Sequence, residues 1–281
     1  MNYITPPTHD DSTTLNSLRD KGYSDNANEL ALIEEAYHQY TAANGRTNAL
    51  APIILPQEFR DKFKKLYDNP RLGMEYISVL RSTEEIDSCP MCGSPLIGTL
   101  DHIFPRHQFA EFAIFSKNLV PACHGCNTKR GDAYIGIGDE RILHPYFDEW
   151  LAQRLVYSEL IPTNGNYDRP TLNICLVDPA HLEHAQINFH ITAVIRKTSI
   201  FTKQIQIWTK LKRRPRTYLR YHGGPINDLE LIDYLTETLQ NADYEANGLN
   251  NWKSMIFFGI LQNRNCRDFL IRHWRQLGIA I

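Results

Sequence analysis

The sequence predicts an α+β protein that is mainly helical and carries a short metal-binding segment in its first half. Apolar residues recur at helical intervals before residue 82 and again after residue 198. Two Cys-x-x-Cys pairs enclose a turn-rich stretch from Cys89 to Cys126. Segments rich in β-branched residues, separated by turn residues, follow Ile142 and predict strands.

Composition and charge limit the classes of function. The 281 residues are 42% hydrophobic and carry 30 basic and 32 acidic side chains, for a net charge of −2. A chain that coats nucleic acid is normally strongly basic, so any nucleic-acid contact must come from a local patch. We find neither a secretory signal nor an apolar run of about 18 residues. We therefore expect a cytoplasmic protein without a membrane partner.

The first eighty residues predict helices. Residues 28–44 space apolar and aromatic side chains at helical intervals before Gly45. Pro56 opens a second helical segment, which ends before Asn69-Pro70 and has one apolar face. We expect residues 1–82 to form an N-terminal helical region.

The remainder of the chain predicts both strands and helices. We expect strands over 155–161, 171–178 and 187–195, then a helix from residue 199 that ends in a basic cluster. Further helical segments are expected at about 226–246 and 250–277. The chain thus divides into regions 1–82, 83–140 and 141–281, with the paired cysteines in the second.

The four paired cysteines predict a structural zinc site. Cys89-Pro-Met-Cys92 and Cys123-His-Gly-Cys126 each have the spacing of a zinc knuckle. Two knuckles complete a closed tetrahedron of thiolates without an open position for chemistry. The alternative, a redox dithiol, would need only one Cys-x-x-Cys pair. We therefore expect Zn²⁺ with a structural role.

The segment between and after the knuckles resembles the HNH endonuclease family, in its zinc-clipped branch. Asp101-His102 stands before a proline, Asn118-Leu119 follows, and Asn127 comes directly after the last cysteine. The resemblance covers Cys89 to Asp132 and implies a ββα-metal core. In that core, residues 98–103 and 119–122 form a hairpin, and a helix beginning near the second knuckle carries Asn127.

The resemblance also implies roles for individual residues. His102 corresponds to the general base that takes a proton from water, and Asp101 and Asn127 correspond to ligands of a catalytic Mg²⁺ or Mn²⁺. Asn118 corresponds to the asparagine that supports the hairpin loop within the catalytic set. The family usually has lysine three residues after Asn127, where this chain has Arg130.

Several basic residues are candidate contacts to nucleic-acid phosphates, and each has a plainer alternative as part of a solvated surface. They lie in two groups, one near the knuckles and one at the end of the predicted helix after residue 199. The residues are Arg106, Lys129 and Arg130 in the first group, and Lys212, Arg213, Arg214 and Arg216 in the second.

Three hypotheses about function follow. The first is a metal-dependent endonuclease acting on DNA (RNA is not excluded), as the effector of an anti-phage or restriction system with a protein partner such as a sensor or ATPase subunit. The second is a free-standing restriction or homing nuclease. The third is a zinc-ribbon module that binds nucleic acid without cutting it.

Overall fold

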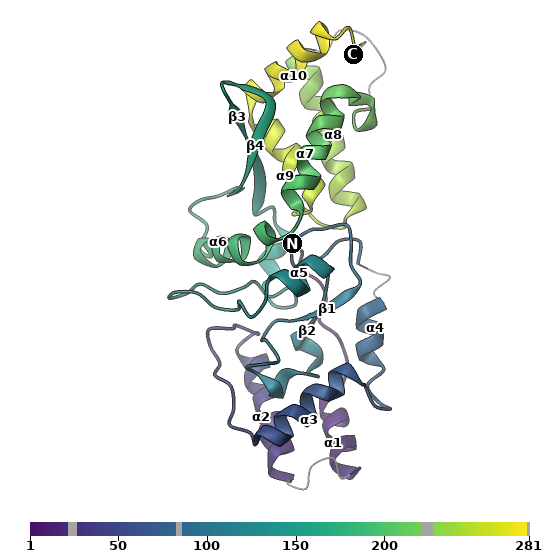
Figure 1. The fold of residues 1–281 in the computed structure, drawn as a ribbon, viewed down its shortest axis with the longest axis vertical. Helices are drawn as coiled ribbons and strands as arrows, with labels where there is room; N and C mark the ends of the chain where they lie inside the picture. The colour runs from purple at the N-terminus through teal and green to yellow at the C-terminus, as the bar shows by residue number, and fades with distance from the viewer. Residues whose placement is uncertain (22–26, 83–85, 221–226, 280–281) are drawn as a thin grey trace.

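The computed structural model describes residues 1–21, 27–82, 86–220 and 227–279. The molecule is elongated (Figure 1), with helices α1 to α4 at one end and helices α7 to α10 at the other. The β1–β2 hairpin and helix α5 lie between these two ends. The predicted α+β class with mainly helical content is confirmed.

The N-terminal helices are α1 (Asp11–Asp20), α2 (Ala27–Ala42), α3 (Gln57–Asp68) and α4 (Tyr76–Ser82). The carboxylate of Asp10 starts α1 by accepting hydrogen bonds from the first backbone amides of the helix. Helix α3 buries the apolar face formed by Phe59, Phe63 and Leu66. The two helices predicted before residue 70 are therefore confirmed.

The central hairpin pairs β1 (Thr99–His102) antiparallel with β2 (Leu119–Ala122), so that His102 lies opposite Leu119. Between the strands run the short 3₁₀ helices η1 (Ala110–Phe112) and η2 (Ser116–Asn118). Helix α5 (His124–Lys129) follows directly and carries Asn127. This is the hairpin-helix order that the sequence predicted.

A second hairpin follows η3 (Glu149–Ala152) and pairs β3 (Val156–Thr163) with β4 (Asn166–Leu176). Two of the three predicted strands are therefore confirmed. The third prediction, a strand over 187–195, is wrong, because α6 (His184–Ala193) and η4 (Ile195–Lys197) occupy it. Ile187, His190 and Ile191 are buried at helical spacing, which a run of β-branched residues also permits.

The C-terminal helices are α7 (Ile200–Arg213), α8 (Asp228–Glu245), α9 (Trp252–Gln262) and α10 (Arg264–Gln276), with η5 (Pro215–Thr217) after α7. The segment predicted as helical over 250–277 breaks at Asn263, whose side chain caps α10 by accepting from the amide of Cys266. Helix α9 crosses β3 so closely that a Cβ at Gly259 would lie 1.8 Å from the carbonyl oxygen of Ser158.

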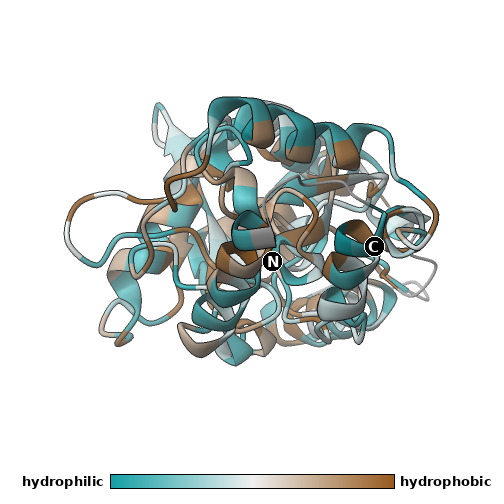
Figure 2. Cartoon of the chain, turned by 90° about the horizontal axis from the view of Figure 1, so that it is seen from below, coloured by the Kyte–Doolittle hydropathy of each residue, from teal (hydrophilic) through white to brown (hydrophobic). Residues whose placement is uncertain are grey.

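The buried side chains form two hydrophobic clusters. The larger one joins α1 to α4, the central hairpin and residues as late as Ile200, with Trp252 and Met255 of α9. The second one fills the space between the β3–β4 hairpin and α7 to α10. Residues 142–156 thus pack with the central hairpin, although the sequence assigned them to the third region. In Figure 2, helices at the edge of the molecule mix hydrophilic and hydrophobic residues along their length, as expected when one face is buried. No described helix is long and apolar enough to cross a bilayer.

Candidate metal centre and nuclease site

The four paired cysteines converge on one point. Their Sγ atoms all lie within 4.8 Å of one another, with Cys89 and Cys126 at 3.9 Å and Cys92 and Cys123 at 3.7 Å. Zinc with Zn–S bonds of about 2.3 Å has sulfur-to-sulfur edges of about 3.8 Å in a tetrahedron. The thiols therefore fit a tetrahedral zinc ion. Hydrogen bonds from the neighbouring thiols, that of Cys126 foremost, lower the pKa of Cys123, which favours the thiolate that binds metal.

The first knuckle is held by segments that lie far from it in the sequence. The backbone N–H of Asn2 donates to the carbonyl oxygen of Pro90 at 3.0 Å, and His190 Nε2 donates to that of Met91 at 2.6 Å. The carbonyl oxygens of residues 92 and 93 accept from the indole and the amide of Trp252, at 2.8 and 3.1 Å. Burial lowers the pKa of His190 to about 3, so its ring stays neutral. Gly93 has φ +76°, and a Cβ there would meet the backbone of Asn250 at 2.2 Å.

Asn118 holds the loop between the strands of the central hairpin. Its Oδ1 accepts from the Phe104 amide at 2.8 Å, and its Nδ2 donates to the carbonyls of Phe104 and Phe112 at 3.2 and 3.0 Å. The side chain is fully buried. These bonds fix the turn after His102, as expected of a supporting residue, and a part in catalysis remains a prediction.

His102 lies at the end of β1, and only 7% of the residue is exposed. Its Nε2 is 3.0 Å from the carbonyl oxygen of Ala113, and the edge of the Tyr67 ring packs against it at 4.5 Å between centroids. Because a carbonyl only accepts, Nε2 carries the hydrogen and Nδ1 is the basic nitrogen. Burial lowers the pKa of His102 to about 4, so the ring is neutral at pH 7 and able to accept a proton.

Asp101 forms a buried ion pair that the sequence did not predict. Arg130 donates from Nη2 to Oδ1 at 2.6 Å and from Nε to Oδ2 at 3.0 Å, and the side chains of Arg130 and Asp101 are only 2% and 4% exposed. The same guanidinium donates to the carbonyls of His102 at 2.6 Å and Ala133 at 2.7 Å. Arg130 therefore ties the end of α5 to β1 through three acceptors, and to the following turn through a fourth.

This arrangement does not fit a hard divalent ion at Asp101. Both carboxylate oxygens already bind a fixed cation, and a second cation beside the guanidinium would be repelled in a site that excludes water. Asn127 is exposed on α5 and offers an oxygen to solvent. The prediction that Asp101 binds Mg²⁺ or Mn²⁺ thus differs from the structure, because Arg130 occupies the carboxylate.

The candidate phosphate contacts near the hairpin differ in exposure. Lys129 is exposed on α5, whereas Arg130 is buried and faces away from any incoming phosphate. Arg106 pairs with Asp68 at 2.7 Å and lies over the Tyr67 ring, 5.1 Å from its centroid. The prediction of a phosphate contact at Arg130 is therefore wrong, because its donors are used within the protein.

The basic cluster at the end of α7 also separates into two kinds of residue. Lys212 is buried and pairs with Asp168 at 2.6 Å, so the prediction of a phosphate contact there is wrong. Three others, Arg213, Arg214 and Arg216, are exposed. Trp208 is buried and donates to the carbonyl of Tyr167 at 2.9 Å, so it is a core residue.

Sequence reasoning missed the aromatic residues that hold the site from outside the HNH-like segment. The ring of Tyr67 in α3 packs against His102. The hydroxyl of Tyr40 in α2 lies 2.8 Å from His144 Nε2 and 3.3 Å from Asn118 Oδ1, and so links these two side chains. Burial lowers the pKa of His144 to about 3. The only signal for these contacts was helical spacing, which indicated burial of Tyr40 without naming its partner.

Comparisons with known proteins agree with this description of the site. Residues 89–133 match the model of the HNH endonuclease family. We call them the HNH segment. Over an aligned stretch of 217 residues, the chain is also 26% identical to "Protein ea31" of Escherichia phage lambda. The aligned stretch is 66% of this chain and 72% of the phage protein. No solved structure matches the chain significantly.

Proposed function

We propose that this protein is an endonuclease that hydrolyses phosphodiester bonds of DNA with His102 as the general base and with a requirement for Mg²⁺ or Mn²⁺. The observation that carries the proposal is the state of His102 within the HNH segment. Its ring is neutral, its tautomer is fixed by the Ala113 carbonyl, and Nδ1 is the basic nitrogen. A neutral imidazole held in one orientation is what proton removal from water requires.

Zinc has a separate, structural role in this proposal. The four thiolates of the cysteine cluster surround the ion and leave no position for water or substrate. We propose that Zn²⁺ fixes α5 to the first knuckle and so sets the position of Asn127 relative to β1. Because Asp101 is bound to Arg130, we assign no step of the reaction to a divalent ion at that carboxylate.

Plasmid cleavage tests the proposal. We expect the zinc-loaded protein to convert supercoiled plasmid to open circles in Mg²⁺ or Mn²⁺ and to stop when a chelator is added. His102→Ala should lower the rate at least about 100-fold, the usual contribution of a general base. His107→Ala is the matched control, because its exposed ring lies in the loop that follows His102. Equal rates for the two variants would refute the role of His102.

A second candidate, a zinc module that binds nucleic acid without cutting it, is favoured by the burial of His102 and by the Arg130 ion pair. The two candidates differ in one result. If the unchanged protein and His102→Ala bind DNA equally and neither nicks it under any metal condition, the binding module is the correct function.

We further propose that the nuclease acts in the cytoplasm of a prokaryote as the effector of an anti-phage or restriction system, with a protein partner such as a sensor or ATPase subunit. The match of residues 89–133 to the HNH endonuclease family supports the nuclease part of this proposal. The test is phage plating on bacteria that express the gene with its neighbouring gene. Unchanged plating with His102→Ala in place of the unchanged protein would refute the defence role.

A further inference from the structure

Two adjoining cavities open on the face of the molecule that carries α5 and α7. The first, of about 630 Å³, lies between the loop after the first knuckle, the second knuckle with α5, and the first turn of α7. We call it the α5–α7 cavity. The second, of about 350 Å³, lies between α7, α8 and the start of α9, and we call it the α7–α9 cavity. Both are lined by Pro95, Lys203 and Trp252, so they are two parts of one depression.

The α5–α7 cavity has the charge of an anion site. Lys129 and Lys203 line it, both are exposed, and in the described parts of the chain neither has a carboxylate at ion-pair distance. No aspartate or glutamate is among the described residues of its wall, although the chain has 32 acidic side chains. The exposed hydroxyls of Ser199 and Thr202 add hydrogen-bond donors. This lining favours phosphate groups.

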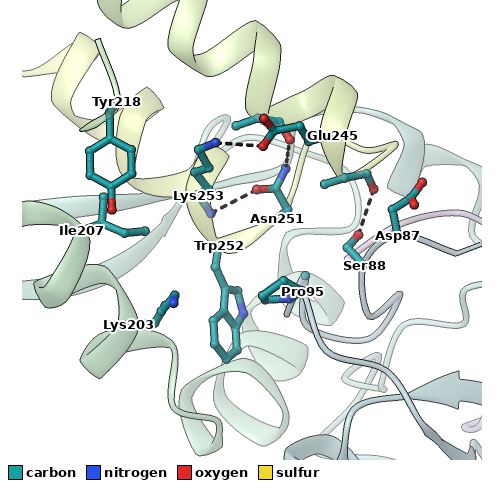
Figure 3. A pocket seen from close by; sticks show the side chains of 13 residues that line it. Asp87, Ser88, Pro95, Lys203, Ile207, Tyr218, Glu245, Asn251, Trp252 and Lys253 are labelled. Carbon is teal, nitrogen blue, oxygen red and sulfur yellow. Dashed lines mark hydrogen bonds and ion pairs between the residues drawn. The ribbon is translucent and has the colours of Figure 1, made fainter. Parts of the chain in front are cut away.

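The adjoining α7–α9 cavity adds aromatic surface. Figure 3 shows Trp252, Pro95 and Lys203 on one side of it, with the ring of Tyr218 farther along the wall. Of its two lysines, Lys253 pairs with Glu245 at 2.8 Å. Asp87 also lines the wall, so the positive charge of the depression comes from Lys203 and from Lys129 of the first cavity. Trp252 is only 7% exposed, so the half-buried Tyr218 is the ring that offers a stacking surface for an unpaired base, beside the phosphate-binding lysines of the depression.

The α5–α7 cavity reaches the central hairpin. Thr99 of β1 lines the α5–α7 cavity, and Asp101 lies two residues further along the same strand. Alternate residues of a strand share a face, and two residues span about 7 Å. Lys129 lies on α5 two residues after Asn127. The cavity therefore borders the strand that carries Asp101 and His102 and the helix that carries Asn127, while the side chains of His102 and Asn127 face away from Thr99 and Lys129.

We propose that the two cavities together bind a single-stranded segment of nucleic acid whose continuation leads to the central hairpin. The inference rests on the proposed nuclease function and adds the class of substrate. Cavities of roughly 300 to 1,000 Å³ hold molecules of the size of one or two nucleotides. A paired base lies inside its stack and does not reach such a wall without being unpaired. The substrate is thus a strand that is unpaired on one side of the scissile bond.

Binding of a fluorescent 12-nucleotide strand tests this inference. Fluorescence anisotropy is measured with zinc-loaded protein at 50 to 200 mM salt without added divalent ion, so that no cleavage occurs. The compared variants are the unchanged protein, Lys203→Gln, and the double variant Lys129→Gln/Lys203→Gln. Lys62→Gln is the control, because this lysine pairs with Glu58 on α3, outside the lining of both cavities.

Each phosphate contact on a single strand adds about 0.7 to the slope of log affinity against log salt. Two contacts therefore account for roughly a sevenfold change in affinity between 50 and 200 mM salt. We expect the double variant to lose this part of the salt dependence and to bind the strand several-fold more weakly at 50 mM. Lys62→Gln should match the unchanged protein.

Competitors separate the sources of phosphate. A duplex of the same sequence and inorganic phosphate should both displace the labelled strand poorly. The inference is overturned if the double variant binds the strand with the same affinity and the same salt dependence as the unchanged protein. It is also overturned if the duplex binds as tightly as the single strand and its binding depends on the same two lysines. Plasmid cleavage is measured separately with His102→Ala. Full cleavage by His102→Ala, or no cleavage by the unchanged protein, with lysine-dependent binding of the strand intact, would contradict the proposed function and leave the inferred strand-binding site supported.

Discussion

The Asp101–Arg130 pair should dominate the local stability of the site. Arg130→Gln would leave the carboxylate in a site where its side chain is 4% exposed, without the two hydrogen bonds of 2.6 and 3.0 Å that now neutralise it. Breaking one partner of a buried ion pair costs about 3 to 5 kcal/mol. Replacing both partners by neutral groups costs much less, because no buried charge is left.

Urea unfolding followed by circular dichroism, with zinc present, measures this effect. We expect Arg130→Gln to lower the free energy of unfolding by about 3 to 5 kcal/mol and the double variant Asp101→Asn/Arg130→Gln to recover much of it. Lys62→Gln breaks an exposed, solvent-screened pair with Glu58 and should leave the free energy of unfolding close to that of the unchanged protein. If Arg130→Gln lowers the free energy of unfolding no more than Lys62→Gln does, Arg130 does not hold the Asp101 carboxylate in solution. The carboxylate is then available to a divalent ion.

Three further variants test other parts of the structure. Cys126→Ser should abolish the zinc content measured by elemental analysis and lower the unfolding temperature, whereas Cys175→Ser, which lies outside the cluster, should change neither. Asn118→Ala removes one acceptor and two donors from buried backbone groups, and should lower the free energy of unfolding by about 3 kcal/mol and reduce plasmid cleavage. His144 has a pKa lowered by burial to about 3, so its contribution to stability is full above pH 6.5 and is lost as the pH falls toward 3. The unchanged protein should therefore lose about 3 kcal/mol more than His144→Gln between pH 7 and pH 4.5, as measured by urea unfolding.

Each of these expectations has a contrary result. Normal zinc content in Cys126→Ser would exclude the four-thiolate site. Unchanged stability in Asn118→Ala would show that the loop after His102 is fixed by other contacts. Identical pH dependence of unfolding in His144→Gln and in the unchanged protein would show that this histidine is not buried as a neutral ring.

The sequence predicted those parts of the fold whose determinants lie close together along the chain. The knuckle spacing was correct, because metal geometry leaves few alternatives over short separations. The order of hairpin and helix, which the resemblance to the HNH family implied, was also correct. The strand expected at 187–195 was wrong, since the buried faces of a strand and of a helix both accept β-branched residues. Tertiary packing decided between them.

The candidate site could be predicted in its residue types but only partly in its contacts. Asp101 and Arg130 are 29 residues apart, and the sequence does not show that the guanidinium faces inward. Exposure of Lys129 and burial of Lys212 likewise depend on the packing of whole helices. Tyr67 reaches His102 from α3, outside the HNH segment, so the resemblance to a short family pattern contains no information about it.

The hydrogen bonds around the first knuckle bear on how the protein is made. Its carbonyl groups are bound by Asn2, His190 and Trp252, so the complete set of bonds needs a chain that has been synthesised beyond residue 252. Chains fold from the N-terminus as they leave the ribosome. A nascent chain that already contains the whole HNH segment therefore has Asn2 but still lacks the donors of His190 and Trp252. The candidate site should therefore mature only after residue 252 has left the ribosome, and a fragment cut to the HNH segment should be poorly folded.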